Sequence, residues 1–330
     1  MTIPRTGWTV ALMVAMSVAA CAPARQASLS SLPAASGSSL SLEDEGRAYM
    51  CPMHPEHTAE KAGECPRCGM KLVLGTPFDM RDYRLDFQTV PALVKAGEKI
   101  TLQLSVFHPG TGEPIKNFEQ VHEKPYHLFV ISQDMEYFQH IHPEQSGEGV
   151  WSIDVTLPKA GYYKVLSDFV PTSGSAQLIA RPLVTAGYAG DLVADSARLV
   201  PDTTTTKTLD DLTVTATYDP ATLVAGLYGH LTFHLTKAGT RDPVTDLQTY
   251  LGAFGHMLIM SEDLVEYVHS HPIERLPTDA DLERLRGGPD VIFEGLMPKP
   301  GRYRAWTQFR YRDTLHTFPF TFEVGTLGSR

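Results

Sequence analysis

The amino-acid sequence predicts a mainly β protein in which a small Cys/His metal-binding knuckle is followed by two tandem β-sandwiches. Three observations support this prediction. Three of the four cysteines lie close together after residue 50, most of the chain beyond them is an internal repeat, and 24 prolines and 26 glycines are spread along 330 residues. Such frequent turn residues favour many short strands over long helices.

Composition and charge narrow the class of function. The chain is 42% hydrophobic and 20% charged, which is typical of a globular protein. It carries 28 Lys and Arg against 38 Asp and Glu, a net charge of −10. Because this charge repels a polyphosphate backbone, we expect no nucleic-acid partner.

The first 20 residues are expected to form a signal peptide. They carry Arg5 and then the apolar run Trp8–Ala20, which is too short to span a bilayer as a helix. Residues 21–46 are rich in Ala, Ser and Pro and have no apolar periodicity. We therefore expect a flexible tether at 21–46.

The end of the signal peptide reads Val18-Ala19-Ala20-Cys21, which resembles the lipobox of bacterial lipoproteins. The resemblance implies that Cys21 is acylated, so that a lipid anchor attaches the chain to a membrane. Ala22 rather than Asp follows this cysteine. By resemblance to Gram-negative lipoproteins, this favours the outer membrane of a bacterial cell envelope, facing the periplasm.

The remaining cysteines predict a metal site at 47–75. Three thiols in an exported protein cannot form an internal disulfide framework, because their number is odd. Cys51 pairs with His54 across a two-residue spacer, and Cys65 pairs likewise with Cys68. Such spacers let paired side chains converge on one ion, and Cys3His is a common tetrahedral set. A zinc knuckle that only holds a loop together is the alternative.

Two methionines favour a softer ion than zinc. Met53 and Met70 lie beside the two pairs, and thioether sulfur suits Cu(I) or Ag(I). The segment Tyr49–Leu72 resembles the short heavy-metal-binding domain of periplasmic adaptors of copper/silver efflux pumps and of some copper-transporting P-type ATPases. The matching motifs are Cys51-Pro52-Met53-His54-Pro55 and Cys65-Pro66-Arg67-Cys68-Gly69-Met70. The resemblance implies capture or hand-over of soft metal ions in the envelope, with metal-efflux components as candidate partners.

The rest of the chain is an internal repeat. A shift of 129 residues superimposes 101–143 on 230–272, and a shift of 140 residues superimposes 158–163 on 298–303. The second copy therefore holds an insertion, in which we expect one helix at Asp279–Arg286. We place the first copy at 79–186, the linker at 187–207 and the second copy at 208–325.

Short β-branched or aromatic segments lie between the turns of each copy. Examples are Ile100–Phe107, Tyr126–Ser132, Trp151–Leu157 and Tyr162–Asp168, which we expect to be strands. Two copies of roughly 110 residues with about seven strands each fit Ig-like or cupredoxin-like β-sandwiches.

Three histidines of the first copy recur in the second: His127, His140 and His142 correspond to His256, His269 and His271. A hairpin turning at Gln133-Asp134 places His127 directly opposite His140. His142 shares their face because strand residues i and i+2 point to the same side. Imidazole suits Cu, Zn or Ni, so each triad is a candidate metal site on an otherwise apolar face.

The second copy repeats this geometry around Glu262-Asp263. Both Asp134 and Asp263 fall at the turns, where Asp is favoured for backbone reasons. The alternative for the triads is that these histidines maintain the fold by binding loop carbonyls. Six histidines without a counterpart are interpreted as surface or packing residues, although His122 is within reach of the first triad: His57, His108, His122, His230, His234 and His316.

The sequence favours metal binding over catalysis. It contains no Gly-x-Ser-x-Gly elbow, P-loop, dinucleotide fingerprint or His-Glu-x-x-His motif, so we assign no catalytic residues and expect no enzyme. We expect an envelope-anchored lipoprotein that sequesters or hands over copper or silver, with zinc as the other metal. The alternatives are a structural docking module of an efflux complex with one structural zinc, and a redox enzyme with two His-ligated coppers.

Overall fold

The computed structural model describes residues 48–51, 57–67, 69–75, 83–172, 174–191, 193–276 and 281–328. The expected signal peptide, Cys21 and the tether lie outside the described residues, as do Met53, His54 and Cys68. Within the described part of the chain every regular element is a strand, and no helix there is long and apolar enough to cross a membrane. The predicted mainly β class, with tandem sandwiches, is confirmed.

The helix expected at Asp279–Arg286 is wrong over its described part. The backbone N–H groups of Arg284 and Leu285 donate to the carbonyl of Asp281, which makes a single turn. The chain then enters the short strand β19 (Arg286–Gly287), which pairs with β16 (Leu247–Gln248). Sheet pairing therefore outweighs the local helix preference of this charged segment.

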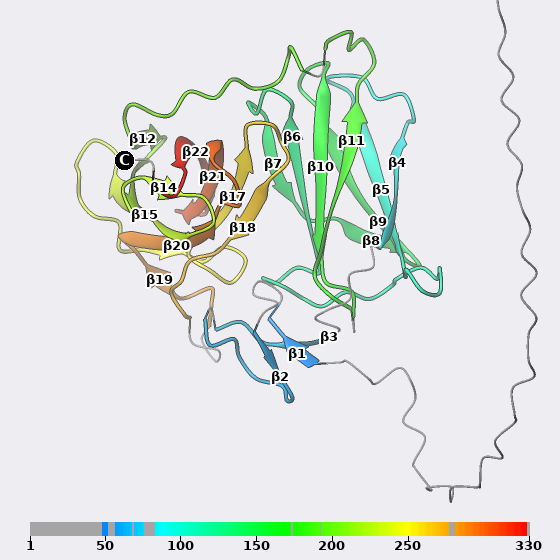
Figure 1. Cartoon of the computed structure of the whole chain (residues 1–330), viewed down its shortest axis with the longest axis horizontal. Helices are drawn as coiled ribbons and strands as arrows, with labels where there is room; N and C mark the ends of the chain where they lie inside the picture. Colours follow the sequence, from blue (N-terminus) through cyan, green and yellow to red (C-terminus); the bar gives the residue numbers. More distant parts are fainter. Residues whose placement is uncertain are drawn as a thin grey trace, which may run out of the picture. The chain divides into compact units, whose positions relative to one another are not determined.

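The first repeat is a sandwich of two four-stranded sheets, coloured cyan to green in Figure 1. One sheet has the order β4 (Arg84–Val90), β5 (Lys99–Phe107), β9 (Val150–Thr156) and β8 (Glu144–Gly147). The other has the order β11 (Gln177–Val184), β10 (Tyr162–Phe169), β6 (Tyr126–Ser132) and β7 (Phe138–Ile141). Alternate residues of β5 are buried, as expected for a strand with one face on a core.

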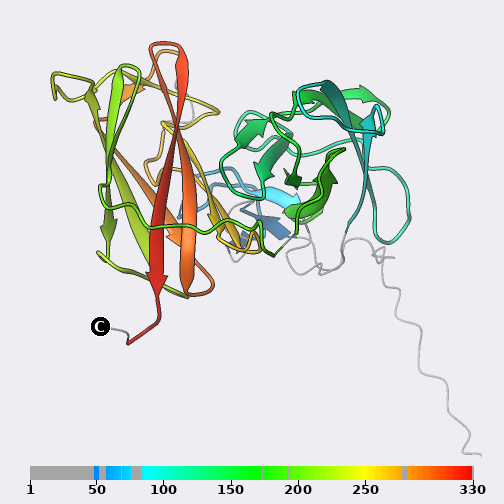
Figure 2. The same ribbon diagram turned by 90° about the horizontal axis from the view of Figure 1, so that it is seen from above.

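The second repeat has the same plan. One sheet has the order β12 (Thr206–Leu209), β13 (Leu212–Asp219), β15 (Tyr228–Lys237) and β20 (Asp290–Leu296). In the other, β14 (Leu223–Val224), β22 (Thr314–Gly325), β21 (Gly301–Tyr311), β16 and β19 follow one another, and β17 (His256–Ser261) joins β21 to β18 (Tyr267–Ser270). Figure 2 shows β21 and β22 as a long antiparallel pair.

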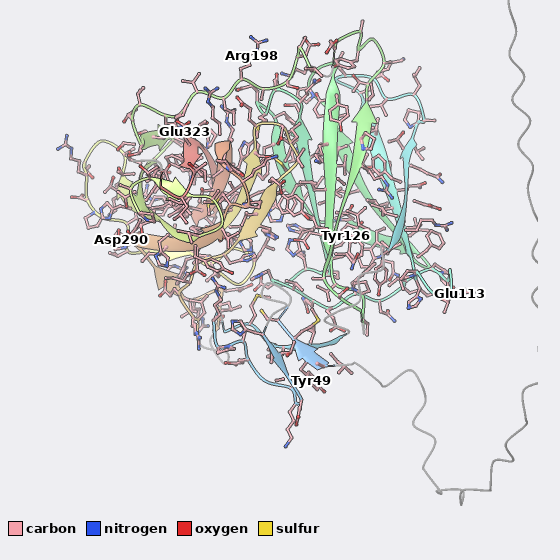
Figure 3. The ribbon with its side chains drawn as sticks, in the orientation of Figure 1. Tyr49, Glu113, Tyr126, Arg198, Asp290 and Glu323 are labelled. Carbon is pink, nitrogen blue, oxygen red and sulfur yellow. The ribbon has the colours of Figure 1, made fainter. Side chains whose placement is uncertain are left out.

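The segment before the repeats forms a small sheet of its own. Its order is β2 (Thr58–Ala59), β1 (Ala48–Met50) and β3 (Val73–Gly75). Beneath it Cys51, Cys65 and Leu72 make a small buried cluster. Figure 3 shows Tyr49 on β1 of this sheet and Tyr126 inside the first repeat.

Both faces of β6 and of β17 are buried along their whole lengths. One face of β6 carries Leu128 into the core of the first repeat. The other face carries Phe129 and Ile131 into a separate apolar cluster, which also holds Leu258 and Met260 of β17. The two sandwiches therefore pack against each other through these outer faces.

Reciprocal contacts relate the two repeats. The Arg304 guanidinium donates to the Met135 carbonyl at 2.9 Å, and the Lys164 ammonium donates to the Leu264 carbonyl. Arg304 is the repeat equivalent of Lys164, and Leu264 that of Met135. Such an exchange of equivalent contacts is the signature of a two-fold relation between the packed units.

Candidate metal centre

The hairpin that carries the first triad has a different register from the predicted one. The N–H of Ser132 donates to the carbonyl of Tyr137 at 3.0 Å, and Met135 adopts a φ of 60° within the turn. The loop therefore has four residues rather than two. As a result His140 pairs with Phe129 and not with His127.

The register of the second hairpin differs in the same way, with His269 opposite Leu258. A shift of two residues keeps every side chain on its predicted face, because strand side chains alternate with period two. The histidines of each hairpin therefore still share a face, but that face lies between the repeats. The two aspartates take the expected turn role: Asp134 and Asp263 each accept from the hydroxyl of the serine two residues earlier, at 2.6 Å.

The structure brings His127, His140 and His142 together. Their ring centroids lie 4.8 to 5.3 Å apart, and one nitrogen from each falls within 4.8 Å of the others. His127 and His140 are 2% and 8% exposed. This group comes from the first repeat alone, as predicted from the sequence.

The hydrogen-bond partners of this triad leave one ring nitrogen of His127 facing one of His140. His127 Nε2 lies 2.9 Å from the carbonyl of Val121, and His140 Nδ1 lies 2.9 Å from Gln308 Oε1. Both oxygens accept, so these two nitrogens carry the protons. A neutral imidazole has one N–H, which leaves His127 Nδ1 and His140 Nε2 deprotonated and 3.0 Å apart. Two nitrogens bound to one tetrahedral ion at 2.0–2.1 Å would lie about 3.3 Å apart.

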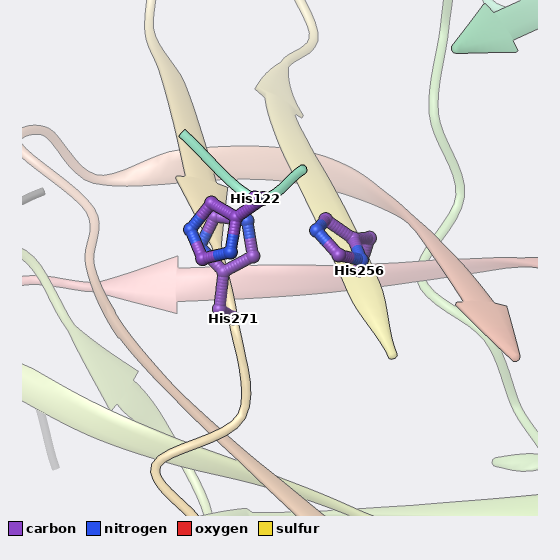
Figure 4. A group of neighbouring side chains, drawn as sticks. All are labelled: His122, His256 and His271. Atoms are coloured by element: carbon purple, nitrogen blue, oxygen red, sulfur yellow. The ribbon is translucent and has the colours of Figure 1, made fainter. Parts of the chain in front are cut away.

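The second group of three is not the predicted one. It consists of His122, His256 and His271, whose nitrogens also lie within 4.8 Å of one another (Figure 4). The His122 ring stacks on that of His271 with centroids 3.4 Å apart, so one of these rings must rotate before both bind the same ion. His122 belongs to the segment before β6, in the first repeat. Sequence comparison missed it because Leu251 stands at the equivalent position of the second repeat.

His269, predicted to complete the second triad, lies outside both groups of three. Its Nδ1 donates to Asp168 Oδ2 at 2.7 Å, across the boundary between the repeats. This contact mirrors the one between His140 and Gln308, because Asp168 and Gln308 are repeat equivalents. The His269 ring still lies 4.5 Å from that of His271 and 5.6 Å from that of His127. The seven histidines thus form one continuous cluster.

Most of the second group has no hydrogen-bond partner. Both ring nitrogens of His256 and of His271 are buried and unpaired among the described residues, and so are Nε2 of His122, His142 and His269. Buried polar atoms are usually satisfied, and orphans of this kind call for a ligand. Free imidazole nitrogens clustered in an apolar surrounding are suited to bind a transition-metal ion.

The environment keeps these rings neutral. Burial, and to a lesser extent the neighbouring histidines, lower the pKa of His127 to about 4 and that of His142 to about 3. The pKa values of His122, His140, His256 and His271 also lie well below 6.5, chiefly because of burial. A neutral imidazole offers the lone pair that a metal requires.

The small N-terminal sheet places the described sulfur donors. Cys51 and Cys65 are buried, and Met70 packs against their cluster. The Cys65 N–H donates to the Met70 carbonyl at 2.7 Å, and the Gly69 N–H donates to the Cys65 carbonyl at 2.8 Å. Gly69 has a φ of 79°, a conformation that glycine adopts without strain. The turn therefore brings Cys65 and Met70 close together.

The other histidines stand apart from the cluster. His108 Nδ1 accepts from the N–H groups of Gly110 and Thr111, and His234 pairs with Asp290 at 2.6 Å. His316 is buried, at 1% exposure, on β22. Among the six histidines without a sequence counterpart, only His122 enters a described group of potential ligands.

Comparisons with known proteins match both parts of the chain. A family model described as the domain of unknown function DUF8832 matches residues 76–185 and 207–326. A second model, described as a heavy metal binding domain, matches residues 48–73. The sequence resemblance of Tyr49–Leu72 to such a domain is thus confirmed. A comparison with curated proteins gives no match.

Solved structures give only distant likenesses. The chain is similar to the Escherichia coli adhesin FdeC, at 14% identity over 78% of this chain and 68% of that one, with a TM-score of 0.23. It is also similar to the Yersinia pseudotuberculosis adhesin InvE, at 10% identity over 74% and 61%, with a TM-score of 0.21. Likenesses this distant carry no argument about function.

Proposed function

The chain belongs to the family of the domain of unknown function DUF8832, and we propose that it is a metal-binding protein of the bacterial cell envelope. It carries a heavy metal binding domain at residues 48–73. In this proposal, the sulfur donors of that domain capture an ion, and the histidine cluster between the repeats holds further ions. The protein sequesters copper or silver, or hands it over, and performs no catalysis.

One observation carries the proposal: His127 Nδ1 and His140 Nε2 lie 3.0 Å apart, and the other nitrogen of each ring faces an oxygen acceptor. In neutral rings these contacts leave lone pairs on the two facing nitrogens. Without a cation the lone pairs repel each other, and an uncompensated buried polar atom costs about 1–3 kcal/mol. The outer nitrogens are fixed by Val121 and Gln308. Such outer contacts set the tautomer and orientation of metal-binding histidines.

Donor chemistry favours copper. Thiolate and thioether sulfur select Cu(I) or Ag(I), whereas imidazole binds Cu in either oxidation state and also Zn. Copper is therefore the ion that suits both parts of the chain. Zinc is the alternative at the histidine cluster, where three imidazoles and an open position are a common zinc arrangement.

The proposal includes attachment to a membrane through Cys21. Its support is the signal-peptide pattern of residues 1–20 and the lipobox resemblance. The envelope then places the metal-binding parts on the periplasmic side, near metal-efflux components. Replacement of Cys21 by Ala should release the chain from the membrane fraction.

Metal stoichiometry tests the proposed function. The purified chain, titrated anaerobically with Cu(I), should bind three ions, and the double variant His127→Ala with His256→Ala should bind one. The matched control replaces two histidines outside the cluster, His230 and His234, by Ala and should keep three. If the wild-type chain binds a single zinc and no copper, the docking-module interpretation is correct instead.

A second candidate is a redox enzyme with two His-ligated coppers. The observation that favours it is the nearness of the two groups: the rings of His140 and His256 lie 5.9 Å apart. Oxygen consumption by the copper-loaded chain with a phenolic reductant separates the two functions. Catalytic turnover would favour the enzyme, whereas its absence with all three ions bound supports storage or hand-over.

A further inference from the structure

We propose that the heavy metal binding domain passes its ion directly to the site formed by His122, His256 and His271, through a cavity that both parts line. This inference rests on the proposed function, since it requires that both parts bind the ion. It adds a direction of transfer within one chain. The observations that carry it are a specific docking contact and the lining of the cavity.

The docking contact is made by the turn that follows Cys65. The Arg67 guanidinium forms an ion pair with Glu294 of β20, with Nε 2.8 Å from Oε1, and lies 3.8 Å from the ring centroid of Tyr228. From the other side, Arg275 donates to the carbonyl of Pro66. The second repeat therefore holds the turn of the heavy metal binding domain that carries its donors.

The docked turn closes one side of a cavity of ≈ 200 Å³. Met70 and Gly69 line it from the heavy metal binding domain, and His122 and His271 line it from the histidine cluster. One thioether donor and two imidazoles thus line the same cavity. Both imidazoles carry a buried unpaired nitrogen.

The charged side chains that line this cavity balance one another: Glu274 and Glu294 line it together with Arg67 and Arg275. The deepest ligand, His256, is 1% exposed, so an ion needs a route past His122 and His271. A buried metal site requires such an entry path.

The transfer is a ligand exchange without redox chemistry. The ion stays Cu(I), its bonds to sulfur break as bonds to imidazole nitrogen form, and each released thiolate takes up a proton from water. Met70 offers an intermediate donor that is neutral and exchanges without protonation. Rotation of the stacked rings of His122 and His271 completes the new coordination.

The first triad has a different opening. His142 lines a separate pocket with Glu144, Gln145 and Asp154, and the described lining contains no residue of the heavy metal binding domain. Direct entry from solvent through that pocket is therefore the competing route, and the experiment must distinguish the two.

Rapid-freeze Cu K-edge X-ray absorption distinguishes them, because sulfur and nitrogen ligands give different spectra. The full chain receives three equivalents of Cu(I), one for each proposed site, from a soluble chelate and is frozen at increasing times. Sulfur-bound copper should appear first, and nitrogen-bound copper should accumulate in a second step. In Arg67→Ala, which releases the docked turn, the second step should slow on the order of tenfold with the same final ligation. Met70→Leu should slow it as well.

The control is Arg84→Ala, because Arg84 also has an ion-pair partner, Asp86, and an aromatic ring, Phe107, but lies on β4 away from the cavity. It should leave both steps unchanged. Equal rates in wild type, Arg67→Ala and Met70→Leu would overturn the relay while leaving the proposed function intact. Absence of nitrogen-bound copper in the wild-type chain, even with excess Cu(I), would overturn both.

Discussion

The two histidine groups differ although the repeats that carry them are equivalent. The first comes from one hairpin, and the outer nitrogens of His127 and His140 are held by Val121 and Gln308. The second borrows His122 from the other repeat, and both nitrogens of His256 are unpaired among the described residues. The first group is thus oriented by hydrogen bonds, whereas within the described part of the chain His256 and His271 of the second group are held by packing.

A single position accounts for much of this difference. His122 and Leu251 are repeat equivalents and share a left-handed backbone, with φ of 48° and 52°. Because the repeats are related by a two-fold axis, His122 of the first repeat lies next to His256 and His271 of the second. The two repeats therefore share the same backbone at this position, and the single change between His122 and Leu251 gives a group of three histidines that spans both repeats.

The largest expected effect comes from removing this difference. His122→Leu should abolish the second group, because only the edge-on pair of His256 and His271 remains. Affinity for one of the bound ions should fall by more than the roughly 10–100-fold typical of changes around a metal site. Leucine already occupies the equivalent backbone at 251, so the metal-free chain should keep its stability. Competition with a chromophoric Cu(I) chelator measures the affinity.

His234→Leu is the control for this change, because His234 is an exposed histidine of β15 that belongs to neither group. An unchanged number and affinity of ions in His122→Leu would show that the inter-repeat group does not bind metal.

A smaller effect is expected from pH on the metal-stripped chain. The folded pKa of His127, about 4, lies below the ordinary value of 6.5, so the unfolded chain binds more protons between these values and stability falls as pH decreases through this range. Relative to neutral pH, this one histidine should lower the free energy of unfolding by about 2 kcal/mol at pH 5. Urea unfolding in the presence of a chelator, from pH 7 to pH 4.5, measures the loss.

The variant His127→Asn with His142→Asn lacks two of the titrating rings and should show a shallower decline than the wild-type chain. An identical pH profile in the two proteins would mean that these rings are not held neutral by burial.

The smallest effect concerns the reciprocal contacts. Asp168→Asn keeps a hydrogen-bond acceptor for His269 but removes the carboxylate charge, and Gln308→Glu introduces such a charge beside His140. We expect Gln308→Glu to strengthen metal binding, because a carboxylate partner raises the basicity of the ligating His140 imidazole. Asp168→Asn should leave metal binding nearly unchanged, because His269 lies outside both groups of three. Calorimetric titration of both variants measures the difference; a weaker affinity in Asp168→Asn would show that His269 is a ligand.

Several features followed from the sequence because they depend on local pattern. Alternation and turn residues predict the strands, and the faces of His127, His140 and His142 follow from the period of two. The hairpin register did not follow, since the backbone of Met135 and Leu264, at φ of 60° and 59°, lengthens each turn. A leucine or methionine in that conformation gives no signal in the sequence.

Strand periodicity, turn residues and ligand spacing are enough to predict the fold class, the heavy metal binding domain, the repeat and six of the seven clustered histidines. The contact between the outer faces of β6 and β17 is seen in the folded chain and not in these patterns. This contact joins the histidines into one cluster, brings His122 to His256 and His271, and places His269 beside Asp168. The physical reason is that strand periodicity reports which face is apolar but not what covers it. The covering surface is set by packing between residues more than 100 positions apart, such as His269 and Asp168, whose separation is 101.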